Sequence, residues 1–209
     1  MSLTFEKPVE TVHELRQIMG YPNEVVTRKT IGHLDRYCLD FIQNSPFITI
    51  ATSDAAGRLD VSPKGDPAGF VKPLDQYTLA IPDRPGNKKA DTLTNIIQNP
   101  RIGLIFLIPG IKETLRINGS AQVVRDQSVL DLLVCNGKTP EFAIIVHVEE
   151  AFMHCAKCMI RSELWKNVEE VKARPVPSLG KILVDHAQLD IPSTELDERI
   201  RQDEKTNLY

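Results

Sequence analysis

The stretch FITIATSDAAGRLDVSPKGD, residues 47–66, predicts two strands joined by a tight turn. Residues 47–52 are apolar or β-branched, which is typical of a strand in a packed sheet. The next residues, SDAAG at 53–57, are small or turn-forming. In 58–62, Leu59 and Val61 alternate with polar residues, so one face of the second strand is apolar. This pattern favours a β-hairpin.

Working outward from this hairpin, apolar or alternating segments predict further strands at 77–81, 101–108, 113–124 and 142–148. Helical periodicity predicts helices at 9–19, 31–42, 88–98 and 126–134, and a helix is also expected at 151–160. Two more short helices are expected near the C-terminus, at 179–186 and 193–205. Six or so strands with few helices between them favour an antiparallel barrel over a parallel sheet.

The composition excludes several classes of protein. The 209 residues include 25 basic and 28 acidic side chains, a formal net charge of −3, which excludes a strongly basic nucleic-acid binder. The longest apolar run, residues 102–108, is far shorter than the about 20 residues of a membrane-spanning helix. The N-terminus lacks the pattern of a secretory signal, and the four cysteines are too few and scattered for a disulfide framework. We therefore expect a cytoplasmic protein with no membrane or nucleic-acid partner.

A basic turn at 84–89 is the first candidate binding segment. Arg84, Asn87, Lys88 and Lys89 precede a predicted helix, whose N-terminus offers free N–H groups and the positive end of the helix dipole. Cations there oppose the dipole unless an anion compensates, which favours a phosphate site over a merely solvated basic turn.

Three other segments are weaker candidates. The strand end Ser62-Pro63-Lys64 could hold a flat heterocycle or an anion, although the segment alone favours a plain surface turn. Arg116 and Asn118 share one strand face, which could simply be solvent-exposed. The segment HCAKC at 154–158 holds a CxxC pair and a histidine, but the second half of a zinc ligand set is missing from the sequence.

The segment after the CxxC pair adds two cations at helical spacing. Lys157 and Arg161 lie four residues apart, so they share one face of a helix and fit an anionic partner. The sequence contains no phosphate loop and no Gly-x-Ser-x-Gly motif. We predict no metal, and no residue is identified as catalytic.

Taken in order, these segments resemble the FMN-binding split-barrel flavoproteins related to pyridoxamine 5'-phosphate oxidase. The resemblance spans about residues 34–165 and includes FITIATSDAAGRLDVSPKGD, YTLAIPDRPGNKKADTLTNIIQNPRIGLIF and ETLRINGSAQVV. The HCxK…RSxLW segment and the tail SLGKILxDH are similar to an extended subgroup of that family. The tail lacks the Arg-x-His pattern with which true pyridoxamine-phosphate oxidases bind substrate.

The resemblance implies a mainly β fold with flanking helices: a six-stranded antiparallel split barrel, homodimeric, with FMN at the subunit interface. It implies an N-terminal helical extension at 1–33, the barrel domain at 34–165, and a helical tail at 166–209 packed on the barrel or on the dimer partner. The residues that it assigns to the cofactor are Arg58, Ser62, Pro63, Lys64, Arg84, Asn87, Lys88, Lys89, Arg116, Asn118, Lys157, Arg161 and Trp165.

Within that set, Arg84 to Lys89 would bind the FMN phosphate and Arg58 to Lys64 would line the flavin ring and ribityl chain. Arg116 and Asn118 would reach the cofactor from the partner subunit. The expected function is an FMN-dependent oxidoreductase acting on a small molecule. The alternatives are a non-catalytic FMN carrier or redox sensor, and a haem- or deazaflavin-binding protein on the same barrel.

Overall fold

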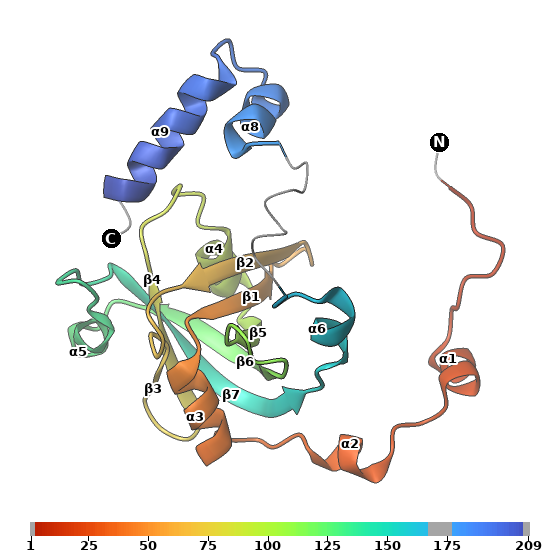
Figure 1. Cartoon of the computed structure of the whole chain (residues 1–209). Helices are drawn as coiled ribbons and strands as arrows, with labels where there is room; N and C mark the ends of the chain where they lie inside the picture. The colour runs from red at the N-terminus through yellow and green to blue at the C-terminus, as the bar shows by residue number, and fades with distance from the viewer. Residues whose placement is uncertain (1–2, 167–176, 207–209) are drawn as a thin grey trace.

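A curved antiparallel sheet forms the centre of the molecule (Figure 1). The computed structural model describes residues 3–166 and 177–206. The strands are β1 Phe47–Ser53, β2 Leu59–Gly65, β3 Lys72–Pro73, β4 Thr78–Asp83, β5 Arg101–Leu107, β6 Thr114–Val124 and β7 Phe142–His154. They form one sheet in the order β2-β1-β5-β6-β7-β4-β3, which confirms the predicted mainly β, antiparallel architecture. The sheet has seven strands rather than six because the two-residue β3 pairs with β4.

The sheet curls so that strands distant in its order meet. The end of β2 lies beside the end of β4: the Lys64 Nζ is 3.2 Å from the Asp83 Oδ1. Just beyond both strands, the Arg84 Nε is 2.6 Å from the Asp66 Oδ2. These two ion pairs join segments separated by four other strands in the sheet order, and so they fasten one end of the barrel.

The inner face of the sheet carries the hydrophobic core, because alternate residues of each strand point inward. The fully buried members are Ile48, Ile50, Leu79, Ile81, Leu104, Phe106, Leu115, Ile117, Ile144 and Val146. Helix α3, Arg36–Asn44, adds Cys38 and Ile42 to this cluster. Helix α4, Asp91–Gln98, packs on β1, where the buried Asn95 Nδ2 donates to the Thr52 Oγ1 at 3.1 Å.

One expected helix, 151–160, is wrong in its first half. Strand β7 continues to His154, and residues 151–154 pair with β6 from Ile117 back to Thr114. Ala151 also exchanges backbone hydrogen bonds with Ile31. The helix that follows, α6, spans only Lys157–Ser162. The apolar residues at 151–154 have helical spacing, but backbone pairing with β6 on one side and with Ile31 on the other keeps them extended.

The predicted helix at 126–134 is a short α5, Gln127–Leu130, continued by a 3-10 turn, Asp131–Leu133.

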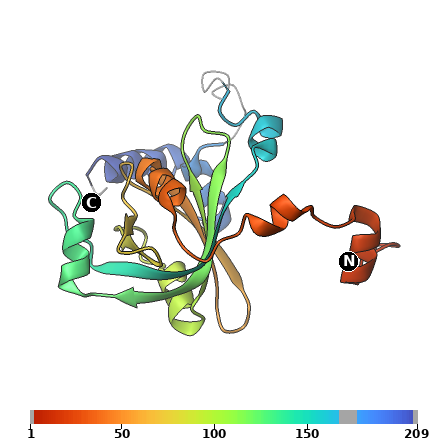
Figure 2. The ribbon, with the colours of Figure 1, turned by 90° about the horizontal axis from the view of Figure 1, so that it is seen from below.

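Helical segments flank the barrel at both ends of the chain. Helices α1, Val12–Met19, and α2, Glu24–Arg28, lie on a segment that extends away from the sheet (Figures 1 and 2). Near the C-terminus, α8, Leu179–Ala187, packs against α9, Ser193–Thr206. Asp197 joins these two helices by accepting from the Ser178 hydroxyl and the Gly180 N–H.

Helices α1, α8 and α9 correspond to the helices predicted at 9–19, 179–186 and 193–205, whereas α2 was not predicted. The predicted tail at 166–209 includes residues 167–176 and 207–209, which lie outside the described residues. None of the helices in the described part of the chain combines the length and the apolar character needed to cross a lipid bilayer.

Candidate functional site

The candidate site is a pocket of about 530 Å³ at the end of the barrel that the two ion pairs fasten. We call it the basic pocket. Its walls come from the end of β2, the loop between β4 and α4, and the segment leading into β7. The lining residues are Lys64, Asp83, Arg84, Pro85, Gly86, Asn87, Lys88, Ala90, Leu93, Lys138, Thr139, Pro140, Glu141 and Phe142. This volume lies in the range of small-molecule and cofactor sites, about 300–1,000 Å³.

The charge of the basic pocket is positive on balance. Its lining includes four cationic side chains and two carboxylates. One carboxylate, Asp83, pairs with Lys64 at the wall. Arg84 is largely buried: its Nε contacts Asp66, and its Nη2 donates to the Leu133 carbonyl at 2.9 Å. The arginine therefore supports the wall, while Lys88 and Lys138 reach the pocket from two other segments.

Most of the loop at 84–90 lines the pocket, and the loop leads directly into helix α4. Within the loop, the Asn87 Oδ1 accepts from the Lys89 N–H at 3.0 Å. Lys88 and Ala90 both have left-handed backbone conformations, with φ of 63° and 55°. Ala90 is the N-cap of α4, and its side chain caps no N–H group. A helix N-terminus without a side-chain cap, next to lysines, suits an anion that accepts from the first-turn N–H groups. An anion site at this loop stays a prediction.

Of the thirteen predicted cofactor residues, four line the basic pocket: Lys64, Arg84, Asn87 and Lys88. Lys89 lies beside them in sequence, but its Nζ contacts the Asp91 carboxylate at 2.6 Å. That ion pair raises the pKa of Lys89. Lys88 rather than Lys89 is therefore the lysine placed for a ligand in this pocket.

The other predicted residues of β2 lie along its length. The Ser62 Oγ donates to Asp60, which also accepts from the Thr92 hydroxyl of α4. Pro63 is exposed on the opposite face of the strand. Arg58 lies at the hairpin turn, where its Nε is 2.6 Å from Asp54. Hydrogen bonds from the backbone N–H and side chain of Arg58 hold the pKa of Asp54 below its usual range.

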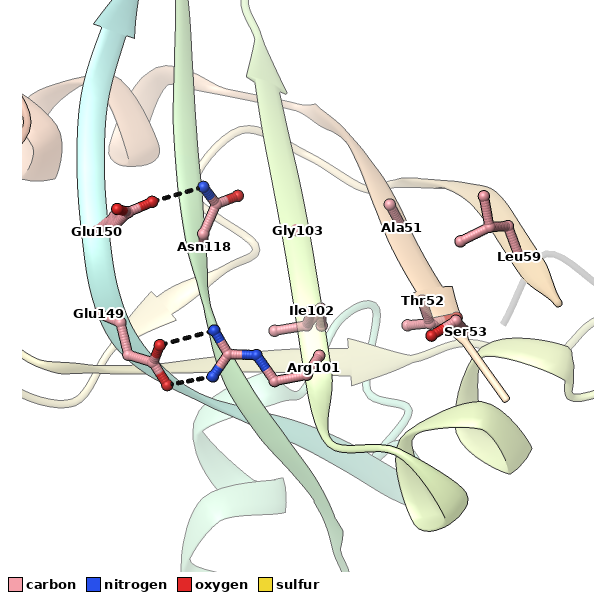
Figure 3. A pocket seen from close by; sticks show the side chains of 10 residues that line it. All are labelled: Ala51, Thr52, Ser53, Leu59, Arg101, Ile102, Gly103, Asn118, Glu149 and Glu150. Carbon is pink, nitrogen blue, oxygen red and sulfur yellow. Dashed lines mark hydrogen bonds and ion pairs between the residues drawn. The ribbon is translucent and has the colours of Figure 1, made fainter. Parts of the chain in front are cut away.

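Arg116 and Asn118 lie on the outer face of the sheet, away from the basic pocket of their own chain. Asn118 donates to the Glu150 carboxylate at 2.9 Å inside an open groove of about 630 Å³ (Figure 3). In the same groove, the Arg101 guanidinium binds both oxygens of Glu149, at 2.7 and 2.8 Å, and lowers the pKa of Glu149. The Arg116 guanidinium lies 5.3 Å from the centre of the Phe152 ring.

The residues at the far end of β7 form a third group. Lys157 and Arg161 are exposed residues of α6, and the Trp165 Nε1 donates to the Ile111 carbonyl at 2.8 Å. Cys155 and Cys158 are exposed free thiols. By contrast, burial raises the pKa of the Cys38 thiol to about 11. Over residues 3–166 and 177–206, no three His, Cys, Asp or Glu side chains are grouped to hold a metal ion.

One wall of the basic pocket, residues 138–142, was not predicted from the sequence. The signal for it is Asn136-Gly137, where both residues have positive φ and form a tight turn bridged by Cys135 and Lys138. The sequence predicts a helix end at this position. The residues after the turn come close to the loop at 84–90 because β4 pairs with β7. This pairing is a long-range contact, which local sequence does not reveal.

The match to a protein family spans the barrel. Residues 34–155 match the family model described as pyridoxamine 5'-phosphate oxidase. The chain belongs to the pyridoxamine 5'-phosphate oxidase family. The family match includes the whole sheet and the loop at 84–90, so the basic pocket lies within the shared part of the chain. No curated protein matches the sequence.

Several solved structures are similar to this member of the pyridoxamine 5'-phosphate oxidase family. HupZ of Group A Streptococcus is 23% identical, with a TM-score of 0.46, over 55% of this chain and 88% of the HupZ chain. General stress protein 26 of Bacillus anthracis is 12% identical, with a TM-score of 0.43, over 55% and 88%. An FMN-binding protein from Syntrophomonas wolfei is 11% identical, with a TM-score of 0.42, over 58% and 88%.

Proposed function

We propose that this chain is an FMN-dependent oxidoreductase that acts on a small molecule, and that the basic pocket binds the phosphate end of the FMN. The observation that carries the proposal is the loop at 84–90. It combines Lys88, a left-handed turn and a helix N-terminus whose N-cap side chain makes no hydrogen bond. A phosphate at that position would accept hydrogen bonds from the N–H groups and neutralise the lysines.

The other residues of the pocket suit the rest of the ligand. Leu93 and Phe142 supply apolar walls for a flat ring system, and Lys64 lines the pocket from the end of β2. When bound, FMN supplies the hydride or electron transfer, and the protein contributes binding, orientation and charge near the ring. The Lys64 ammonium, already held beside Asp83, would place a positive charge near the polar edge of the ring.

We further propose a homodimer formed through the outer face of the sheet. Its exposed residues are mainly small or apolar where β2, β1 and β5 lie side by side, as in the row Pro63, Thr49 and Ile105. Leu59 and Val61 on this face are 83% and 66% exposed. A dimer would cover them, and it would bring Arg116 and Asn118 towards the cofactor of the partner subunit.

The proposal also assigns the remaining predicted cofactor residues and the location of the protein. We assign Lys157, Arg161 and Trp165 to the rim of the site, as the resemblance implies, and we place Arg58, Ser62 and Pro63 along its β2 wall. We also propose the cytoplasm as the location, because the four cysteines are too few and scattered for a disulfide framework.

The first experiment is the visible absorption spectrum of the purified protein, with any released cofactor identified by mass. We expect the two-band spectrum of a flavin and the mass of FMN. A colourless protein that does not bind added FMN would contradict the proposal, and a Soret band on addition of haem would favour the haem-binding alternative. FMN bound without turnover by any nicotinamide donor or by oxygen would favour a carrier or sensor.

The placement of the phosphate is tested with two neighbouring lysines. Lys88→Ala should weaken FMN binding by roughly 10- to 100-fold, the loss of one charge-assisted hydrogen bond, and should change riboflavin binding much less. Lys89→Ala is the matched control, because Lys89 is already paired with Asp91, and its effect on FMN should be smaller. Equal weakening of FMN and riboflavin by Lys88→Ala would place the phosphate elsewhere.

A further inference from the structure

The N-terminal arm, residues 3–30, contains a well-formed amphipathic helix whose apolar face is exposed. Helix α1 is capped by the Thr11 hydroxyl, which accepts from the Glu14 N–H at 3.1 Å. The apolar stripe of α1 consists of Val12, Leu15, Ile18 and Met19. None of the residues of α1 or α2 is buried, and Val12 and Ile18 are 73% and 71% exposed. An isolated helix of this length is marginal in water, so its stripe implies a packing partner.

The surface area of the single chain is too large for a compact monomer. The chain exposes 14675 Å². A compact folded protein of 23.5 kDa is expected to expose about 9,800 Å². The difference is roughly 5,000 Å² for one chain, whereas an obligate homodimer buries about 2,000–5,000 Å² in total, or about 1,000–2,500 Å² on each chain. A dimer interface of that size would therefore account for part of the excess. The arm is one of the segments that project from the barrel and account for this excess (Figure 2).

The arm leaves the barrel at the edge of the outer sheet face. Ile31 exchanges backbone hydrogen bonds with Ala151 of β7, at 3.0 and 2.8 Å. The Lys29 Nζ donates to the Met153 carbonyl at 2.9 Å and lies 5.4 Å from the centre of the Phe152 ring. Phe152 is in register with Arg116 on that outer face. The base of the arm is therefore continuous with the surface through which we propose that two copies associate.

We propose that the arm of each subunit crosses to a second copy of this chain and packs the stripe of α1 on the partner's barrel. This inference rests on the homodimer proposed above. Two-fold symmetry would place the base of each arm beside the partner subunit. Residues 20–30, which connect α1 to that base, could span about 25 Å if α2 stays helical and the other residues are extended. Reciprocal packing would bury the stripe twice and account for part of the excess surface of the single chain.

Crosslinking tests the proposal directly in the full-length protein. A photoreactive benzoylphenylalanine is placed at position 19, in the stripe. Light and ¹⁵N-labelled populations are mixed until native mass spectrometry shows mixed dimers, and the sample is then irradiated. We expect crosslinked peptides that join a light arm to a heavy barrel, and the reverse. Uniformly light or uniformly heavy crosslinks alone would show that the arm folds back on its own chain and would overturn the proposal.

A pair of variants tests the energetic role of the stripe. Val12→Asp with Ile18→Asp places two carboxylates in the stripe and should raise the dimer dissociation constant at least ten-fold. His13→Asp with Gln17→Asp places two carboxylates on the opposite face, where the two side chains contact each other at 3.1 Å, and should leave the constant within about three-fold. Equal effects of the two variants would overturn the proposal.

The outcomes separate this inference from the proposed homodimer. A protein that stays monomeric at every concentration in analytical ultracentrifugation would overturn both proposals. A dimer that gives only single-isotope crosslinks would leave the homodimer in place and overturn the exchange of arms. So would a dimer whose dissociation constant does not change in the Val12→Asp with Ile18→Asp variant.

Discussion

Helices α1 and α3 begin in the same way and end in different surroundings. Each is amphipathic, and each is capped by a side-chain oxygen: Thr11 accepts from Glu14 and Asp35 accepts from Cys38. Yet α3 buries Ile42 completely in the barrel, whereas α1 buries none of its residues. Local sequence signals therefore specify both helices, but only tertiary packing makes a helix part of the stable core. The barrel and the arm are stabilised by different kinds of contact.

The largest difference in the free energy of unfolding is expected when one ion pair of the barrel and one of the arm are each removed. In the barrel, the Asp66 and Arg84 side chains are 3% and 15% exposed. Asp66→Ala leaves the guanidinium without this carboxylate inside the protein, which should lower the free energy of unfolding by about 3–5 kcal/mol. In the arm, Glu24 pairs with Arg28 at 2.8 Å with both side chains exposed, so Glu24→Gln should cost only about 0–1 kcal/mol.

Urea unfolding followed by circular dichroism measures both variants. A loss below about 1 kcal/mol for Asp66→Ala would mean that water solvates Arg84 freely, and the barrel end would then be held by other contacts.

A second comparison uses the same substitution at two sites. Ile42→Ala removes a fully buried side chain from α3 and should lower the free energy of unfolding by about 2–5 kcal/mol, because a cavity remains in the core. Ile18→Ala removes an exposed side chain from α1 and should change barrel unfolding by less than about 0.5 kcal/mol in dilute protein. Equal losses in dilute protein would show that the arm packs on its own barrel.

The barrel was largely predictable because its signals are local and repeated. Strict alternation in residues 113–124 marks β6, and the turn at 53–57 marks the first hairpin. The predicted helix at 151–160, which is wrong in its first half, shows the limit of such signals. There the extended backbone is imposed by β6 on one side and by Ile31, more than a hundred residues away in sequence, on the other.

The candidate site was only partly predictable for the same reason. The charge pattern at 84–89 indicates the loop that lines the pocket, but it does not distinguish Lys88 from Lys89. Only the backbone conformation separates them: Lys88 has a positive φ and lines the pocket, whereas Lys89 turns to Asp91. Lys138 joins the pocket through long-range strand pairing, which no local pattern encodes.

The smallest difference in the free energy of unfolding is expected when the N-cap residues of α3 and α1 are each replaced. Asp35→Ala should lower the free energy of unfolding by about 0.5–2 kcal/mol at pH 7, because the cap of α3 supports a helix that is packed in the core. Thr11→Ala removes the cap of α1 and should leave barrel unfolding unchanged, since α1 contributes no buried residue. Both variants are compared with the parent protein by urea unfolding.

The pH dependence sharpens this comparison, because only one of the two caps titrates. The hydrogen bond from the Cys38 N–H, at 2.9 Å, holds the pKa of Asp35 below its usual value. A carboxyl whose pKa is lower in the folded state stabilises the fold above its unfolded pKa, near 3.8, and loses that contribution as the pH falls through the folded value. The gap between the parent protein and Asp35→Ala should therefore narrow below about pH 4. Asp35→Asn, which caps without ionising, should keep a constant gap to Asp35→Ala across the same range. A gap to the parent that stays constant into acid would mean that the Asp35 charge contributes nothing, and that the α3 cap acts as the uncharged Thr11 cap does.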